Sequence, residues 1–179
     1  MMKKIITIKK ENALLRKVSK NVSLDDIKSK KIQNLITDMK EALSRESHGV
    51  ALAAPQVGEL LRIFIVAGFV FANMEGEEYD ENTHKTQVFI NPEILNVSKK
   101  KMKGDEGCLS VPGLYSWNVR RYEKITISYF DEFCEKHTRG ASGFLARIFQ
   151  HEIDHLNGQL YIDVAEKVEK VDKNFKKID

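Results

Sequence analysis

Apolar residues recur at three- and four-residue intervals along two main parts of the chain, and this spacing predicts two helices. The first covers residues 23–47, where Ser23 and Asp26 resemble a helix-capping pair and Gly49 lies just beyond the end. The second covers residues 144–156, with Gly158 as the stop signal. A looser pattern of apolar residues among lysines predicts a third, amphipathic C-terminal helix over residues 164–178.

The segments between the first two helices have the character of strands and turns. Strands are expected over residues 3–8, 61–67, 88–90, 94–97 and 125–130. An acidic surface loop is expected over residues 73–86, and a solvated hairpin around the lysines of residues 99–103. The pattern therefore predicts an α+β fold of mostly antiparallel strands packed around a central helix, with an N-terminal and a C-terminal helix, in a single domain over residues 1–179.

Composition narrows the class of protein without identifying a function. The chain has 179 residues, 42% hydrophobic and 31% charged, and a net charge of +3, which is typical of a soluble globular protein without a DNA-binding groove. The first residues lack the apolar core of a signal peptide, and no segment approaches the ~20 apolar residues of a membrane span. Two cysteines make no disulfide framework, so a cytoplasmic protein is expected.

The second predicted helix carries the motif H-E-x-x-H at His151, Glu152 and His155. Residues four apart lie on one face of a helix, one turn from each other, so both imidazoles can bind one metal ion. Glu152 is rotated ~100° from His151 and could accept a proton from a water molecule beside the metal. A pair of histidines at this spacing can arise by chance, but the complete motif on an amphipathic helix favours a metal site.

A catalytic site of this kind needs a third protein ligand. The extended metzincin motif would place a histidine at position 161, which is Tyr161, and no glutamate follows Glu169 to complete a thermolysin-like site. The third ligand is therefore expected upstream, at one of four residues: His48, His84, His137 or Cys108.

Cys108 is the favoured choice among these four. It follows Gly107, which allows a close approach of the backbone, and its thiolate is a strong ligand for a borderline-soft divalent ion. A small buried hydrophobic role is the alternative, and that role suits Cys134 better.

A third stretch, Gly-Val-Ala-Leu-Ala-Ala-Pro-Gln over residues 49–56, would by itself be interpreted as a tight turn rich in small residues. Taken with residues 106–110 and 150–155, it resembles the three signature motifs of the peptide deformylase family, in the family's order and at similar spacing. The resemblance covers most of the chain, from about the first expected strand to about Val164. One departure is Ala51, where the family usually has a second glycine. Its methyl group could narrow the substrate groove or restrict a backbone that glycine leaves free.

The resemblance implies a metal-dependent hydrolase that removes the formyl group from N-formylmethionine on nascent chains and releases formate. It implies Cys108, His151 and His155 as ligands of one divalent metal ion. Fe(II) is the metal expected in the cell, although zinc, nickel or cobalt could also occupy such a site. Glu152 would be the general base, while the Gln56 side chain and the Leu109 backbone N–H would stabilise the oxyanion.

The same resemblance implies a peptide-binding groove. An extended formylmethionyl peptide could pair with strand edges near residues 49–51 and 107–109. The substrate-binding residues are then expected to be Gly49, Val50, Ala51, Phe144 and Ile148.

Two supporting interactions and one further partner are also expected. Arg120 could either pair with Glu106 to brace the strand before Cys108 or lie at the surface, and Asp154 could accept a hydrogen bond near the metal. A transient contact with the ribosome is expected from the substrate, with the C-terminal lysines, including Lys173, as possible RNA contacts.

Two alternatives predict different observations. A metallopeptidase would cut internal peptide bonds in place of releasing formate. A non-catalytic, metal-stabilised binding module would have no need of Glu152.

Overall fold

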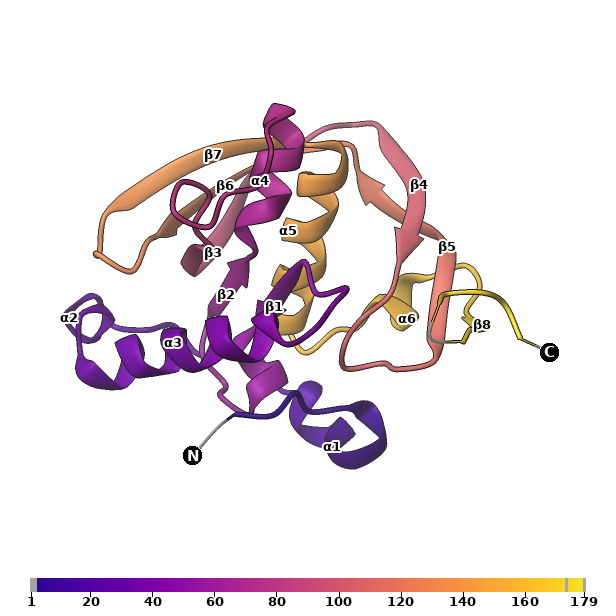
Figure 1. The fold of residues 1–179 in the computed structure, drawn as a ribbon, viewed down its shortest axis with the longest axis horizontal. Coiled ribbons are helices and arrows are strands. Elements are labelled where there is room, and N and C mark those ends of the chain that lie inside the picture. The colour runs from indigo at the N-terminus through magenta and orange to yellow at the C-terminus, as the bar shows by residue number, and fades with distance from the viewer. Residues whose placement is uncertain (1–2, 173, 179) are drawn as a thin grey trace.

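Two antiparallel sheets and one central helix form the body of the computed structural model (Figure 1). The structure describes residues 3–172 and 174–178. The first sheet has the strand order β1-β2-β3-β6-β7 and the second has the order β4-β5-β8. The strands of the first sheet are β1 (Ala51–Ala53), β2 (Ile63–Val66), β3 (Gln87–Val97), β6 (Lys124–Phe130) and β7 (Lys136–Ser142). Those of the second are β4 (Lys101–Glu106), β5 (Leu114–Tyr122) and β8 (Glu169–Lys170).

The helices surround these sheets, except for α5, which runs between them (Figure 1). They are α1 (Ile8–Leu15), α2 (Leu24–Ile27), α3 (Lys30–Ser44), α4 (Gly68–Glu75), α5 (Gly143–Leu156) and α6 (Tyr161–Val164), with a 3₁₀ turn, η1 (Ala54–Val57). Among the described residues, no helix combines the length and the apolar character needed to cross a bilayer.

Helix α5 is held in place by an apolar face that packs on the first sheet. Phe149 is fully buried there, with its ring centroid 4.9 Å from that of Phe89 and 5.8 Å from that of Phe64. The rings of Phe64 and Phe89 stack at 4.6 Å. Aromatic contacts of this kind add to the hydrophobic stabilisation from burial, so they hold α5 firmly against the first sheet. The predicted α+β fold, with antiparallel strands around this helix, is confirmed.

The N-terminal region differs from the prediction in two details. Residues 3–7 form no strand, and the chain enters α1 at Ile8. The helix predicted over residues 23–47 is divided into α2 and α3, because Ser29 acts as a second N-cap and accepts a hydrogen bond from the Ile32 N–H. The predicted cap at Ser23 is present and accepts from the Asp26 N–H.

The predicted C-terminal helix over residues 164–178 is wrong. In its place, the chain leaves α6 at Val164 and adds β8 to the edge of β5, with Leu114 opposite Lys170 and Tyr115 opposite Glu169. A bridge between residues 171 and 177 then reverses the chain direction. The apolar spacing in this segment suits a helix, but β-branched valines also suit strands, and pairing with β5 decides between the two. Lys173 lies outside the described residues.

Candidate active site

Helix α5 presents the H-E-x-x-H motif from the face opposite its aromatic core contacts. His155 and Glu152 are buried, with 1% and 4% of their surfaces exposed, and His151 is half-buried. The two imidazole rings lie 5.0 Å apart between centroids, one turn from each other. The helix ends as the sequence predicted, with Gly158 two residues beyond it at a φ of +73°.

Cys108 reaches these histidines from the loop that follows β4. Its Sγ lies 3.2 Å from His155 Nε2, and one donor atom from each of Cys108, His151 and His155 lies within 4.8 Å of the other two. Two tetrahedral ligands 2.0–2.3 Å from one ion are separated by ~3.5 Å, so this donor set fits a single divalent metal ion. One thiolate and two imidazoles suit zinc, iron or nickel better than magnesium or calcium.

The orientation of His151 is fixed by a carboxylate on the opposite side of its ring. His151 Nδ1 lies 2.9 Å from Glu106 Oε2, which leaves Nε2 to face a metal. Glu106 in turn receives two hydrogen bonds from the Arg121 guanidinium, at 2.8 and 2.9 Å, and one from Arg147 at 2.9 Å. Arg121 also pairs with Asp154 on α5. This set of five residues, the Glu106 network, joins β4, β5 and α5 behind the candidate metal ligands.

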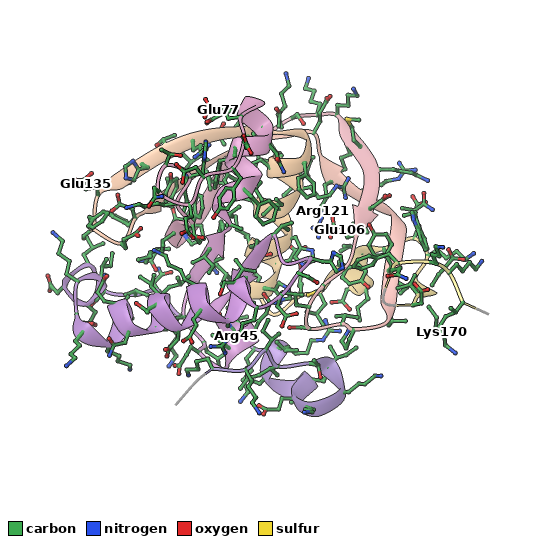
Figure 2. The ribbon with its side chains drawn as sticks, in the orientation of Figure 1. Arg45, Glu77, Glu106, Arg121, Glu135 and Lys170 are labelled. Carbon is green, nitrogen blue, oxygen red and sulfur yellow. The ribbon has the colours of Figure 1, made fainter. Side chains whose placement is uncertain are left out.

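Figure 2 shows Glu106 and Arg121 together at the centre of the molecule, where α5 meets the second sheet. Burial alone would raise the pKa of Glu106, but hydrogen bonds from Arg121 and His151 outweigh burial and lower the pKa to about 2. Burial alone would lower the pKa of Arg121, but hydrogen bonds to Glu106 and Asp154 and their negative charges outweigh burial and raise it. Both groups are therefore charged at neutral pH.

Of the two roles expected for Arg120, the structure has the surface role and no pairing with Glu106. Its side chain points away from the site and binds Glu166 at 2.7 Å. The neighbouring Arg121 occupies the expected role, because successive residues of a strand face opposite sides of the sheet.

Glu152 occupies a different environment from Glu106. Burial raises its pKa from 4.5 to about 7, and the nearby negative charge of Glu106 acts in the same direction, against the lowering effect of His151 and Arg121. Its Oε2 is buried and has no hydrogen-bond partner among the described residues. A buried carboxylate oxygen with no protein donor fits a role toward a bound water molecule or substrate, and its pKa suits proton transfer near neutral pH.

Gln56 approaches from η1 with a side chain whose orientation is determined. Its Oε1 accepts the Ala53 backbone N–H at 2.8 Å, so Nε2 must point the other way, toward Ser110 Oγ at 3.1 Å and Cys108 Sγ at 3.5 Å. Within residues 3–172 and 174–178, the Leu109 backbone N–H donates to no protein acceptor. Two hydrogen-bond donors therefore lie beside Cys108: the Gln56 amide group, which is close in space, and the N–H of Leu109, the next residue in the sequence.

These groups open onto a cavity of about 470 Å³. One wall comes from the residues before β1, the other from the loop between β4 and β5, and the floor from α5. All the residues predicted for substrate binding and catalysis contribute to its lining: Gly49, Val50, Ala51, Gln56, Leu109, Phe144, Ile148 and Glu152, together with Cys108 and His151. His155 lies deeper, behind Cys108.

The other three histidines that the sequence offers as a third ligand lie outside the group around Cys108. His84 contacts Glu77, and His137 contacts Asp131, both away from α5. His48 lines the rim of the cavity, but it does not belong to the group of donor atoms around Cys108.

Sequence reasoning did not identify Arg121, Arg147, Tyr115 or Phe175, all of which contribute to the site or its lining. Arg147 lies one turn before His151 on the predicted helix, which is a signal that could have suggested it. Phe175 had no such signal, because its place depends on the unexpected path of the C-terminal segment.

Comparison with known proteins gives a consistent result. The family model described as polypeptide deformylase matches residues 2–171. The peptide deformylase of Helicobacter hepaticus is 41% identical over 175 residues, which cover 96% of this chain and 90% of the relative. That of Christiangramia forsetii is 39% identical over 162 residues, which cover 88% and 79%.

The solved structures that resemble this chain include members of the same family. A peptide deformylase from Legionella pneumophila superposes with a TM-score of 0.75 and 34% identity, covering 93% of this chain and 87% of that one. A peptide deformylase from Synechococcus elongatus in complex with actinonin superposes with a TM-score of 0.73 and 32% identity, covering 91% and 78%.

Proposed function

The chain belongs to the polypeptide deformylase family, and we propose that Cys108, His151 and His155 hold its metal ion. As a member of that family it is a metal-dependent hydrolase that removes the formyl group from N-formylmethionine at the start of newly made polypeptides and releases formate. A divalent ion between these three side chains supplies Lewis acidity, which lowers the pKa of a nearby water molecule and polarises a carbonyl group.

Glu152 is proposed as the general base and then the general acid. Its buried carboxylate takes a proton from the attacking water and later returns it to the amine that leaves as the new N-terminus. A pKa near 7 suits both directions of transfer at neutral pH, because neither protonation state is strongly disfavoured.

Gln56 and Leu109 are proposed to stabilise the oxyanion that develops on the formyl oxygen. The hydrogen bond from the Ala53 N–H holds the Gln56 amide with its NH₂ group toward Cys108, so this donor needs no reorientation during the reaction. Loss of one such donor typically reduces kcat by about 10²–10³-fold, and Gln56→Leu is expected to fall in this range.

We propose that the methionine side chain enters the apolar part of the cavity. Val50 lies on one wall, while Phe144 and Ile148 lie on α5, two turns and one turn before His151. Ile148 is 4% exposed and gives the cavity an apolar base, which suits the flexible apolar side chain of methionine. Gly49 and Ala51 flank Val50 and leave backbone groups near the cavity for an extended peptide.

The observation that carries these assignments is the convergence of three metal-binding donors within 4.8 Å beside a buried carboxylate that lacks a protein partner. The test measures formate release from a short N-formylmethionyl peptide, with the bound metal quantified. Wild type is expected to release formate in proportion to its metal content. Glu152→Gln should retain the metal and lose turnover, whereas Cys108→Ala should lose both. Full turnover by metal-loaded Glu152→Gln would contradict the proposed role.

We further propose Fe(II) as the metal in the cell. A ferrous ion beside the half-buried Cys108 thiolate should be sensitive to oxygen. Iron-loaded protein is expected to lose activity during aeration, while zinc-, nickel- and cobalt-loaded samples keep theirs. Activity of the iron form that survives prolonged aeration would count against this proposal.

A cytoplasmic location and a transient ribosome contact follow from the substrate, and we propose both. Described lysines of the C-terminal segment lie at the surface, among them Lys167, Lys170, Lys176 and Lys177. If they contact RNA, replacing all four with glutamate should reduce co-sedimentation with ribosomes. Unchanged co-sedimentation would exclude them as the contact.

A further inference from the structure

The C-terminal segment after β8 lies at the mouth of the cavity. Val171, Asp172 and Phe175 contribute to its lining, alongside residues of both walls. The segment is held there by defined contacts: the Val171 N–H donates to the Gly113 carbonyl at 3.0 Å, and the Ile178 N–H donates to the Lys170 carbonyl at 3.1 Å. The described residues of this segment therefore form part of the cleft wall.

Phe175 connects the two walls of the cleft. Its ring centroid lies 5.3 Å from that of Tyr115 on β5 and 5.2 Å from that of His48, the residue before Gly49. A Cβ atom added to Gly107 would lie 3.8 Å from Phe175 Cε1, so the ring also lies close to the backbone just before Cys108. A side chain in this position touches both edges that are proposed to receive an extended peptide.

The backbone of Phe175 supports a specific role for the ring. Its φ is +57°, a left-handed conformation that costs energy for a residue with a side chain. Asp172 stabilises the turn, since its carboxylate accepts the N–H groups of Asn174 and Lys176, each at 2.8 Å. Phe175 nevertheless remains 42% exposed. The strained turn therefore leaves an apolar side chain accessible at the cleft.

We propose that Phe175, with Tyr115 and His48, forms an aromatic platform that selects the side chains following formylmethionine in the substrate. This inference rests on the proposed function of the same cleft. The reacting formyl group lies at Cys108 and Glu152, and the methionine side chain lies over α5. The next residues must then leave along the edges near Gly49 and Gly107, which Phe175 spans. Apolar or aromatic side chains at these positions pack on the platform, and small polar ones do not.

The test compares three substrates in the metal-loaded enzyme: N-formylmethionine amide, formyl-Met-Phe-Phe and formyl-Met-Ser-Ser. For wild type we expect a lower KM for the Phe-Phe peptide than for the Ser-Ser peptide. In Phe175→Ala this preference should shrink by about three- to tenfold through KM, with kcat unchanged, since an aromatic contact contributes about that factor. Alanine keeps the left-handed cost of the backbone, so the variant removes the ring without relieving the turn.

The amide substrate separates this inference from the proposed function, because it lacks the residues that would reach Phe175. It should be hydrolysed equally by wild type and Phe175→Ala, and equal rates also show that the variant is folded. If wild type hydrolyses none of the three substrates, the proposed function fails.

Phe175→Tyr should restore the preference, and Phe133→Ala is the matched control, since Phe133 is an exposed aromatic on the turn between β6 and β7. Unchanged discrimination in Phe175→Ala would overturn the platform. So would an equal gain in kcat/KM for both peptides, which would show that Phe175 only obstructs the cleft.

Discussion

Replacing Arg121 with methionine tests the importance of the Glu106 network. The side chains of Arg121 and Glu106 are 8% and 3% exposed, so the substitution removes a partner from a buried charge. Breaking a buried ion pair from one side costs about 3–5 kcal/mol. Glu106 keeps Arg147 and His151 as partners, so we expect about 3 kcal/mol, which corresponds to a fall in Tm of about 6–12 °C for a chain of this size.

The adjacent residue supplies a matched control. Arg120 lies next to Arg121 on β5, but its side chain is 60% exposed and pairs with Glu166, which is 44% exposed. Exposed ion pairs contribute about 0–1 kcal/mol, so Arg120→Met should change the free energy of unfolding little. The two variants remove the same group from the same strand and differ in which face of the sheet they affect.

The assay is urea unfolding of both variants, with metal affinity measured in parallel. Because Glu106 orients His151, Arg121→Met should also weaken metal binding, by about 10–100-fold, as is typical for a residue behind a metal ligand. Equal stability losses in Arg120→Met and Arg121→Met would refute the reasoning. So would a loss of stability in Arg121→Met with unchanged metal affinity, because the network would then not act through His151.

Three other predictions concern pH, a close contact and the groove. The pKa of Glu106 in the folded protein, about 2, lies below its ordinary value of 4.5. The ionised carboxylate therefore stabilises the folded protein above pH 4.5, and this stabilisation is lost as the pH falls toward 2. Urea unfolding of the metal-free protein should show about 3 kcal/mol of acid-dependent stability, which Glu106→Gln lacks. Gly158→Ala should destabilise by more than about 2 kcal/mol in thermal unfolding, since its φ is +73° and the new Cβ would lie 2.4 Å from the Arg16 carbonyl oxygen, whereas Gly140→Ala, with nothing within 4 Å, should have little effect. Ala51→Gly should raise kcat/KM for formylated peptides by up to about fourfold, the effect of one methyl group, and an unchanged value would show that this methyl does not narrow the groove.

The sequence was most informative where local spacing determines geometry. The relation between His151, Glu152 and His155 follows from helical periodicity alone, and the structure has them on one helix as expected. The contribution of Cys108 depended on chemistry and on the family resemblance, because no local pattern determines how a loop 43 residues earlier in the chain meets α5.

The predictions that differ from the structure concern residues whose positions depend on pairing between strands far apart in the sequence. Choosing between Arg120 and Arg121 requires the register of β4 and β5, in which Lys103 lies opposite Arg120 and Met102 opposite Arg121. A shift of one residue exchanges the two faces of a strand, and the sequence of a single strand does not fix it. The helical spacing of the C-terminal segment is misleading for a related reason, because the edge of β5 that it joins cannot be recognised from the segment itself.

The chain order of the proposed metal ligands has a consequence for biosynthesis. Cys108 is translated 43 residues before His151, and every strand of the first sheet also precedes α5. At about 5–20 residues per second, the cysteine exists for several seconds before the histidines have been made. During that interval its thiol has neither imidazole beside it and is open to oxidation or to binding a metal elsewhere. With Cys108, His151 and His155 as the proposed ligands, the site is complete only after α5 has docked onto a sheet whose strands have already been synthesised, so metal insertion is expected late in the life of each new chain.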